Sequence, residues 1–114
     1  MAERRMVSKT VVNTDKFLAM PSSARALYFQ MVINADDDGF VGNLKSLVNL
    51  CGTNSKSVAE LISKEYVYVF NSGVAVLLHW RMHNRIPKDR YISTVYTEEK
   101  SKLVLNDKGI YCLP

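Results

Sequence analysis

The sequence has little of what disulfide-rich or membrane proteins depend on. Its 114 residues include only two cysteines, Cys51 and Cys112, and their spacing matches neither a disulfide framework nor a metal site. No apolar run approaches the roughly 20 residues that cross a bilayer. The cations near the N-terminus are not followed by the apolar stretch of a secretory signal. We therefore expect a cytoplasmic protein with reduced thiols and no membrane contact.

Signatures of catalysis are equally scarce. The Gly-x-x-x-x-Gly-Lys phosphate loop is absent. His79 and His83 are four residues apart, but we expect His79 to end a strand, and no glutamate lies between them to complete a zinc motif. Cys51 lies on the apolar stripe of a predicted helix, which favours packing over reactivity. We therefore predict that the chain is not an enzyme and binds neither a cofactor nor a metal.

One acidic turn resembles a calcium loop. Asn34, Asp36 and Asp38 align with loop positions 1, 3 and 5 of an EF-hand, and Gly39 aligns with its glycine at position 6. Position 12, which must supply a bidentate carboxylate, is Lys45. A cation there excludes the EF-hand. We interpret the segment as a turn in which aspartates accept backbone N–H groups and Gly39 takes a positive φ.

The apolar residues are numerous enough for one core, at 47% hydrophobic against 23% charged. Residues 4–12 have the composition of an extended arm, and a short turn over 15–20 is expected to place Phe17 and Leu18 against the core. Residues 22–34 are predicted to form a helix that is apolar nearly all round. Its main apolar face consists of Ala24, Leu27, Tyr28 and Met31.

Two shorter helices and a hairpin follow. A helix capped by Asn43 is expected to end at Gly52, and another begins after Asn54, with Val58, Leu61 and Ile62 as its apolar stripe. Strand-like residues 66–70 and 74–80 flank a turn with Gly73. This order predicts an α+β fold, a winged helix, in one domain. Its parts are an N-terminal arm (1–13), the helix-turn-helix with its wing (14–80) and a basic post-wing segment with a C-terminal extension (81–114). In that extension a short helix is expected over residues 97–105 and a turn over residues 106–109.

The post-wing segment holds most of the excess charge. Four cations against the single acid Asp89 give residues 80–96 a balance of +3, out of +4 for the whole chain. Aromatic residues are interleaved with these cations, a mixture typical of nucleic-acid surfaces. We expect the third helix to enter the major groove of double-stranded DNA while the post-wing cations hold its phosphates. The predicted contacts are Lys56, Ser57, Lys64, Arg81, Arg85, Lys88, Arg90 and Tyr91.

Several strings occur in a familiar order. They are Phe17-Leu-Ala-Met-Pro-Ser-Ser-Ala, Ala26-Leu-Tyr-Phe, Ala35-Asp-Asp-Asp-Gly-Phe-Val, Ser72-Gly-Val-Ala-Val, His79-Trp-Arg-Met-His-Asn-Arg-Ile-Pro-Lys-Asp-Arg-Tyr, Thr94-Val-Tyr and Glu98-Glu-Lys-Ser. In these the chain resembles the N-terminal domain of phage-type replisome organiser proteins, relatives of the DnaD-like primosomal proteins of Gram-positive bacteria and their prophages. The resemblance implies a winged helix that binds origin DNA during initiation of replication. It also implies a replicative helicase or helicase loader as partner, contacted through a C-terminal domain that these 114 residues do not contain.

Two other functions fit the same pattern. The first is an oligomerisation or protein-docking module, because the helix at 22–34 is apolar nearly all round and the charge of the third helix is weak. A homo-oligomer is expected in either case. The second is a small transcription regulator, which would share the mechanics of DNA binding and differ in its biology.

Overall fold

Helices and short strands alternate along residues 4–113, the part of the chain that the computed structural model describes. The helices are α1 (Lys9–Val12), α2 (Asp15–Leu18), α3 (Ser22–Asn34), α4 (Leu44–Leu50), α5 (Ser55–Ser63), α6 (Trp80–His83) and α7 (Thr97–Ser101). The strands are β1 (Phe40–Val41), β2 (Val67–Val69), β3 (Ala75–Leu77), β4 (Val104–Leu105) and β5 (Tyr111–Cys112). The α+β class is therefore confirmed.

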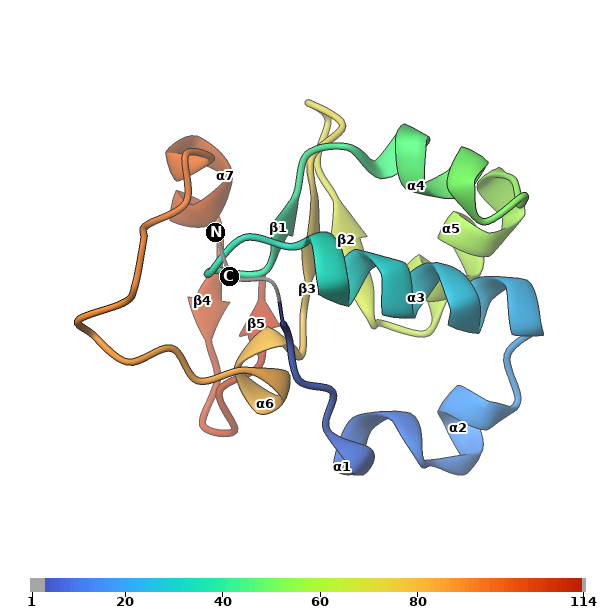
Figure 1. The fold of residues 1–114 in the computed structure, drawn as a ribbon, viewed down its shortest axis with the longest axis horizontal. Helices are drawn as coiled ribbons and strands as arrows, with labels where there is room; N and C mark the ends of the chain where they lie inside the picture. The colour runs from blue at the N-terminus through green and yellow to red at the C-terminus, as the bar shows by residue number, and fades with distance from the viewer. Residues whose placement is uncertain (1–3, 114) are drawn as a thin grey trace.

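The long helix α3 lies where the sequence predicts it, over residues 22–34. The four residues of its predicted apolar face are fully buried, and Val32 joins them in the core. Phe29 and Ile33 behave differently, with 37% and 55% of their surfaces exposed. Helices α3, α4 and α5 lie together on one side of the central sheet (Figure 1).

The turn between α4 and α5 follows its local signals. Gly52 has a φ of +63°, which ends α4 in the left-handed region as expected. The side chain of Asn54 accepts a hydrogen bond of 3.0 Å from the backbone N–H of Lys56 and so caps α5. Asn43 precedes α4, but its side chain makes no capping hydrogen bond. Asn43 therefore holds the expected N-cap position, but its side chain does not cap the helix.

The central sheet has three antiparallel strands in the order β1-β3-β2. The predicted hairpin of β2 and β3 is confirmed, with Gly73 at φ +91° in the turn. Strand β1 was missed by the sequence analysis, since its two residues lie in the segment interpreted as a turn. Phe40 pairs with Val76 and Val41 with Ala75. The order α3-β1-α4-α5-β2-β3 is compatible with the expected winged helix.

The C-terminal part differs from the prediction. Helix α7 stops at Ser101, and residues 104–105 form β4, which pairs with β5 as a second hairpin. The turn at 106–109 is present as expected, with Gly109 at φ +76°. The backbone N–H of Tyr111 donates to the carbonyl of Leu78 over 2.9 Å and joins this hairpin to the end of β3. Residues 103–105 were therefore wrongly assigned to a helix.

The N-terminal arm is also only partly extended. Residues 9–12 form the single turn α1, in which the backbone N–H of Asn13 donates to the carbonyl of Lys9 over 2.9 Å, and both Val11 and Val12 are buried. Residues 1–3 of the predicted arm lie outside the described part of the chain. Of the predicted pair in the next turn, Phe17 is buried, but Leu18 is 52% exposed. No helix within residues 4–113 is long and apolar enough to span a membrane.

Candidate nucleic-acid interface

The acidic turn between α3 and β1 organises the end of the molecule that carries the basic stretch. The carboxylate of Asp36 accepts the backbone N–H groups of Asp38 and Phe40 over 2.9 and 3.0 Å, which confirms the predicted turn. Gly39 has the expected positive φ, +89°. A Cβ on Gly39 would lie 2.5 Å from Cγ of Trp80, so the turn packs directly against α6.

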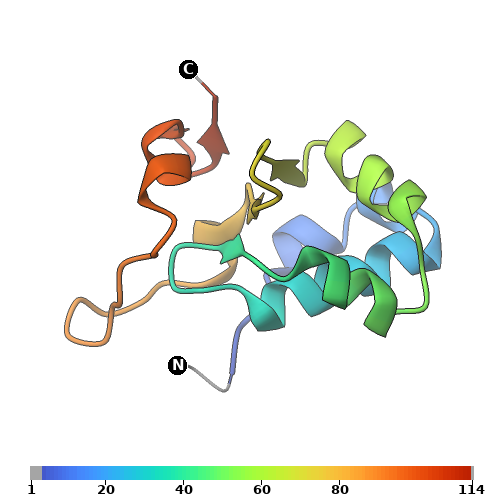
Figure 2. The ribbon, with the colours of Figure 1, turned by 90° about the horizontal axis from the view of Figure 1, so that it is seen from above.

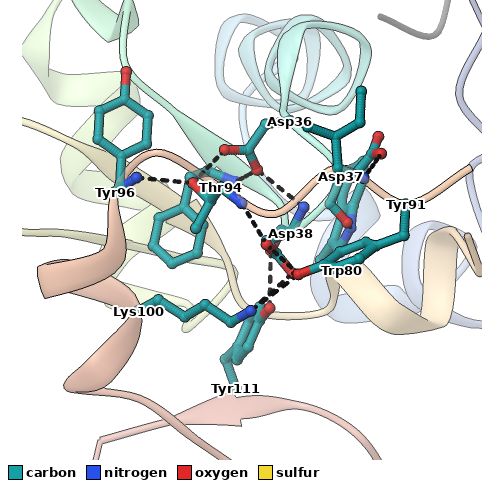
Figure 3. Close-up of polar contacts among 11 residues, drawn as sticks. Asp36, Asp37, Asp38, Trp80, Tyr91, Thr94, Tyr96, Lys100 and Tyr111 are labelled. Atoms are coloured by element: carbon teal, nitrogen blue, oxygen red, sulfur yellow. Dashed lines mark hydrogen bonds and ion pairs between the residues drawn. The ribbon is translucent and has the colours of Figure 1, made fainter. Parts of the chain in front are cut away.

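The three aspartates also anchor residues 85–96, which we call the post-wing loop. The Tyr91 hydroxyl donates to the Asp38 carboxylate, whose oxygens lie 2.7 and 2.8 Å away (Figure 3). The backbone N–H of Thr94 donates to Asp38 over 2.8 Å, and its hydroxyl donates to Asp36. The backbone N–H of Ile92 donates to Asp37 over 3.0 Å. These contacts fix residues 91–94 against the turn, while residues 85–90 project from the body in both views (Figure 1, Figure 2).

Two cations pair with two of the three acids, Asp37 and the buried Asp38. Arg5 pairs with Asp37 over 2.9 Å, and its guanidinium lies 5.3 Å from the centre of the Trp80 ring. Lys100 pairs with Asp38 over 3.3 Å and lies 5.7 Å from the centre of the Tyr91 ring. The hydrogen bond to Tyr91 and the charge of Asp38 raise the pKa of Lys100 above its ordinary value. Two of the three negative charges of the acidic turn are therefore compensated by cations, while Asp36 accepts hydrogen bonds from neutral donors.

A cavity of about 370 Å³ opens between α6, the post-wing loop and the β4–β5 turn. Its lining includes three cations, Arg81, Arg85 and Lys108, beside the ring of Tyr91. The indole N–H of Trp80 donates to the carbonyl of Asp37 over 2.9 Å and closes one wall. Lys108 was missed by the sequence analysis, since a lysine in a remote turn carries no local signal that it belongs to this cavity.

The predicted post-wing cations are all exposed. Arg81, Arg85, Lys88 and Arg90 have open surfaces, and none of them takes part in an ion pair within residues 4–113. Arg81 lies over the ring of Tyr111, with 6.0 Å between the guanidinium carbon and the ring centre. Tyr91 is 38% exposed. The structure thus places Arg81, Arg85 and Tyr91 around one cavity, with Lys88 and Arg90 on the adjoining projection.

The predicted contacts on the third helix lie elsewhere. Lys56 is exposed on α5 and Lys64 is exposed directly after its last residue. Helix α5 lies at the opposite end of the molecule from the post-wing loop (Figure 1, Figure 2). Ser57 is only 5% exposed, so its expected place on the exposed face is wrong. It lies one helical turn before the buried Leu61, on the same face of α5. The Ser57 hydroxyl bonds the hydroxyls of Thr53 and Ser23.

His79 and His83 lie at the two ends of the helical turn α6. His83 follows His79 on a helical turn, with a backbone hydrogen bond of 3.3 Å, so the expectation that His79 ends a strand is wrong. The His83 ring accepts the backbone N–H of Ser8 at Nδ1 over 2.9 Å and meets the Tyr28 hydroxyl at Nε2 over 2.6 Å. Burial lowers the pKa of His83 to about 4. Within residues 4–113, no group of histidine, cysteine and acidic side chains could hold a metal ion.

Comparison with known proteins finds no relative of this chain. The chain matches no protein-family model, no curated protein and no solved structure. The resemblance to replisome organiser proteins therefore stays a prediction from the sequence.

Proposed function

We propose that this chain is a DNA-binding domain that holds the phosphate backbone with α6 and the post-wing loop. The observation that carries the proposal is the set of exposed cations at one end of the molecule, none of them in an ion pair within residues 4–113. Exposed cations outside ion pairs are free to neutralise phosphates and release counterions. The set consists of Arg81, Arg85, Lys88, Arg90 and Lys108.

The winged-helix assignment and the replication role complete the proposal. The element order α3-β1-α4-α5-β2-β3 supports a winged helix. The resemblance to replisome organiser proteins supports a role in initiating phage or prophage DNA replication, with the helicase or its loader as a further partner. In this arrangement the phosphate contacts come from the segment after the wing. The turn at 71–73 contains no lysine or arginine.

Fluorescence anisotropy of labelled DNA across a salt series tests the proposal. The wild type should bind with log K falling linearly as log[salt] rises. Arg85→Ala/Arg90→Ala should make that slope shallower by about 1.8, at about 0.9 per lost phosphate contact on duplex DNA. Absence of binding at low salt would refute the DNA assignment.

A second candidate, self-association, is favoured by an apolar groove. A hollow of about 660 Å³ lies between the end of α3 and residues 92–96. Its lining includes Ile33, Ile92 and Val95, which are 55%, 66% and 83% exposed. Exposed apolar patches of this kind mark interaction surfaces. Sedimentation should show a dimer that Ile92→Ser/Val95→Ser converts to a monomer, and a monomeric wild type would reject this candidate.

A further inference from the structure

We infer that the cavity beside α6 receives one unpaired nucleotide of a DNA strand. Arg81, Arg85 and Lys108 would hold its phosphate, and the ring of Tyr91 would stack against its base. This inference rests on the proposed DNA-binding function and adds the class of DNA that the domain prefers. Gapped or tailed DNA, rather than continuous duplex, becomes the ligand.

The size of the cavity supports a single nucleotide. Its volume of about 370 Å³ lies near the lower end of the roughly 300–1,000 Å³ found for pockets that enclose one small molecule. A base pair inside a duplex exposes only its edges to a protein, because its faces are stacked on the adjacent base pairs. A ring at the cavity wall can therefore meet the face of a base only when that base is unstacked.

The charge around the cavity suits a phosphate. Two carboxylates, Asp37 and Asp38, lie in its wall, but Arg5 and Lys100 pair with them at 2.9 and 3.3 Å. The three cations of the lining exceed these two carboxylates by one, and because Arg5 and Lys100, outside the lining, compensate the carboxylates, the lining cations remain available to a phosphate. The phosphate would contact Arg81, Arg85 and Lys108. Guanidinium groups are well matched to phosphate oxygens.

Tyr91 is held ready for stacking. Its hydroxyl is bonded to both oxygens of Asp38, which is 1% exposed, so the ring is fixed in place (Figure 3). A fixed ring stacks without losing rotamer freedom when the base arrives. Trp80 cannot play this part, because it is 1% exposed. Tyr91, at 38% exposed, is the aromatic ring that the cavity offers.

The test compares three DNAs that share one duplex: blunt, with an internal single-stranded gap, and with a single-stranded tail. Anisotropy titrations at one salt concentration use the wild type, Tyr91→Phe and Tyr91→Leu. Both variants lose the bond to Asp38, but only Tyr91→Leu loses the ring. The difference between them therefore isolates stacking from anchoring of the loop. Circular dichroism melting curves check that both variants fold.

The wild type should bind gapped DNA about fivefold or more tighter than blunt DNA, the lower end of what stacking of one base provides. Tyr91→Leu should lose that preference and bind gapped and blunt DNA alike, while Tyr91→Phe should still prefer gapped DNA. If the tailed DNA alone is preferred, the cavity takes a strand end. Equal affinity of the wild type for all three DNAs overturns the inference but leaves the proposed function standing. Absence of binding to any of them overturns both.

Discussion

Tyr91 is bonded to Asp38, a residue 53 positions earlier, through two contacts of 2.7 and 2.8 Å between its hydroxyl and the carboxylate oxygens. The carboxylate is 1% exposed, and the tyrosine belongs to the loop that carries Lys88 and Arg90. The position of the basic loop therefore depends on a buried acid in the turn between α3 and β1.

Replacing that acid should destabilise the protein. Asp38→Asn removes the charge that accepts hydrogen bonds from Tyr91, Thr94 and Lys100. Hydrogen bonds to a charged group contribute about 1.5–3 kcal/mol, so we expect the free energy of unfolding to fall by about 2–3 kcal/mol. Urea denaturation measures it. The control is Asp107→Asn at an exposed turn, which should change little, and equal stability of Asp38→Asn and wild type would contradict the anchoring role.

Two glycines with nearly the same φ provide a matched pair. Gly39 and Gly73 have φ values of +89° and +91°, but a Cβ on Gly39 would lie 2.5 Å from the Trp80 side chain, while one on Gly73 would meet nothing within 4 Å. Gly73→Ala should cost about 1–2 kcal/mol for the backbone alone. Gly39→Ala should cost a further 1–3 kcal/mol or so for overpacking. Thermal and urea unfolding of both variants measure the difference. Equal losses of unfolding free energy would show that the acidic turn shifts to make room for the added methyl group.

His83 should make stability depend on pH. Burial lowers the pKa of His83 from 6.5 to about 4 in the folded protein. Between pH 4 and pH 6.5 the histidine is therefore protonated in the unfolded chain but neutral in the folded one. The stabilisation is complete above pH 6.5 and declines as the pH falls towards 4. A shift of this size corresponds to about 3 kcal/mol.

The variant His83→Gln isolates this contribution, because the other titrating groups are common to both proteins. We expect the advantage of the wild type in unfolding free energy to shrink by roughly 2–3 kcal/mol between pH 7 and pH 4.5. Urea denaturation at the two pH values gives the comparison. A gap that stays constant would mean that His83 titrates alike in the folded and unfolded chains.

The two ends of the molecule can be separated as DNA surfaces. Lys56→Ala/Lys64→Ala removes one exposed cation from α5 and one from the residue that follows it, at the far end from the post-wing loop. We expect this pair to leave the salt dependence of DNA binding nearly unchanged, since the phosphates are held elsewhere. Anisotropy across the same salt series compares it with Arg85→Ala/Arg90→Ala. A shallower salt dependence for Lys56→Ala/Lys64→Ala, with Arg85→Ala/Arg90→Ala unchanged, would show that the DNA interface lies at α5 instead.

The sequence by itself determined the elements whose signals are local. The apolar repeat sets α3 at residues 22–34, Gly52 and Asn54 set the turn between α4 and α5, and Gly73 sets the hairpin. Each of these signals acts within a few residues, where helix periodicity, capping and left-handed glycine are decided by the neighbouring backbone. The exposure of the four post-wing cations follows in the same way from their charge.

Tertiary structure alone decided how the interface is put together. Asp38 meets Tyr91, Thr94 and Lys100, which are 53 to 62 positions away, and Lys108 reaches the cavity from a separate hairpin. The rotation of α5 buried Ser57, which has the polarity of a surface residue. The physical reason is common to these cases. A carboxylate or a hydroxyl can be satisfied by any donor that the fold brings near, so the local pattern does not specify the partner, and packing of distant elements selects it.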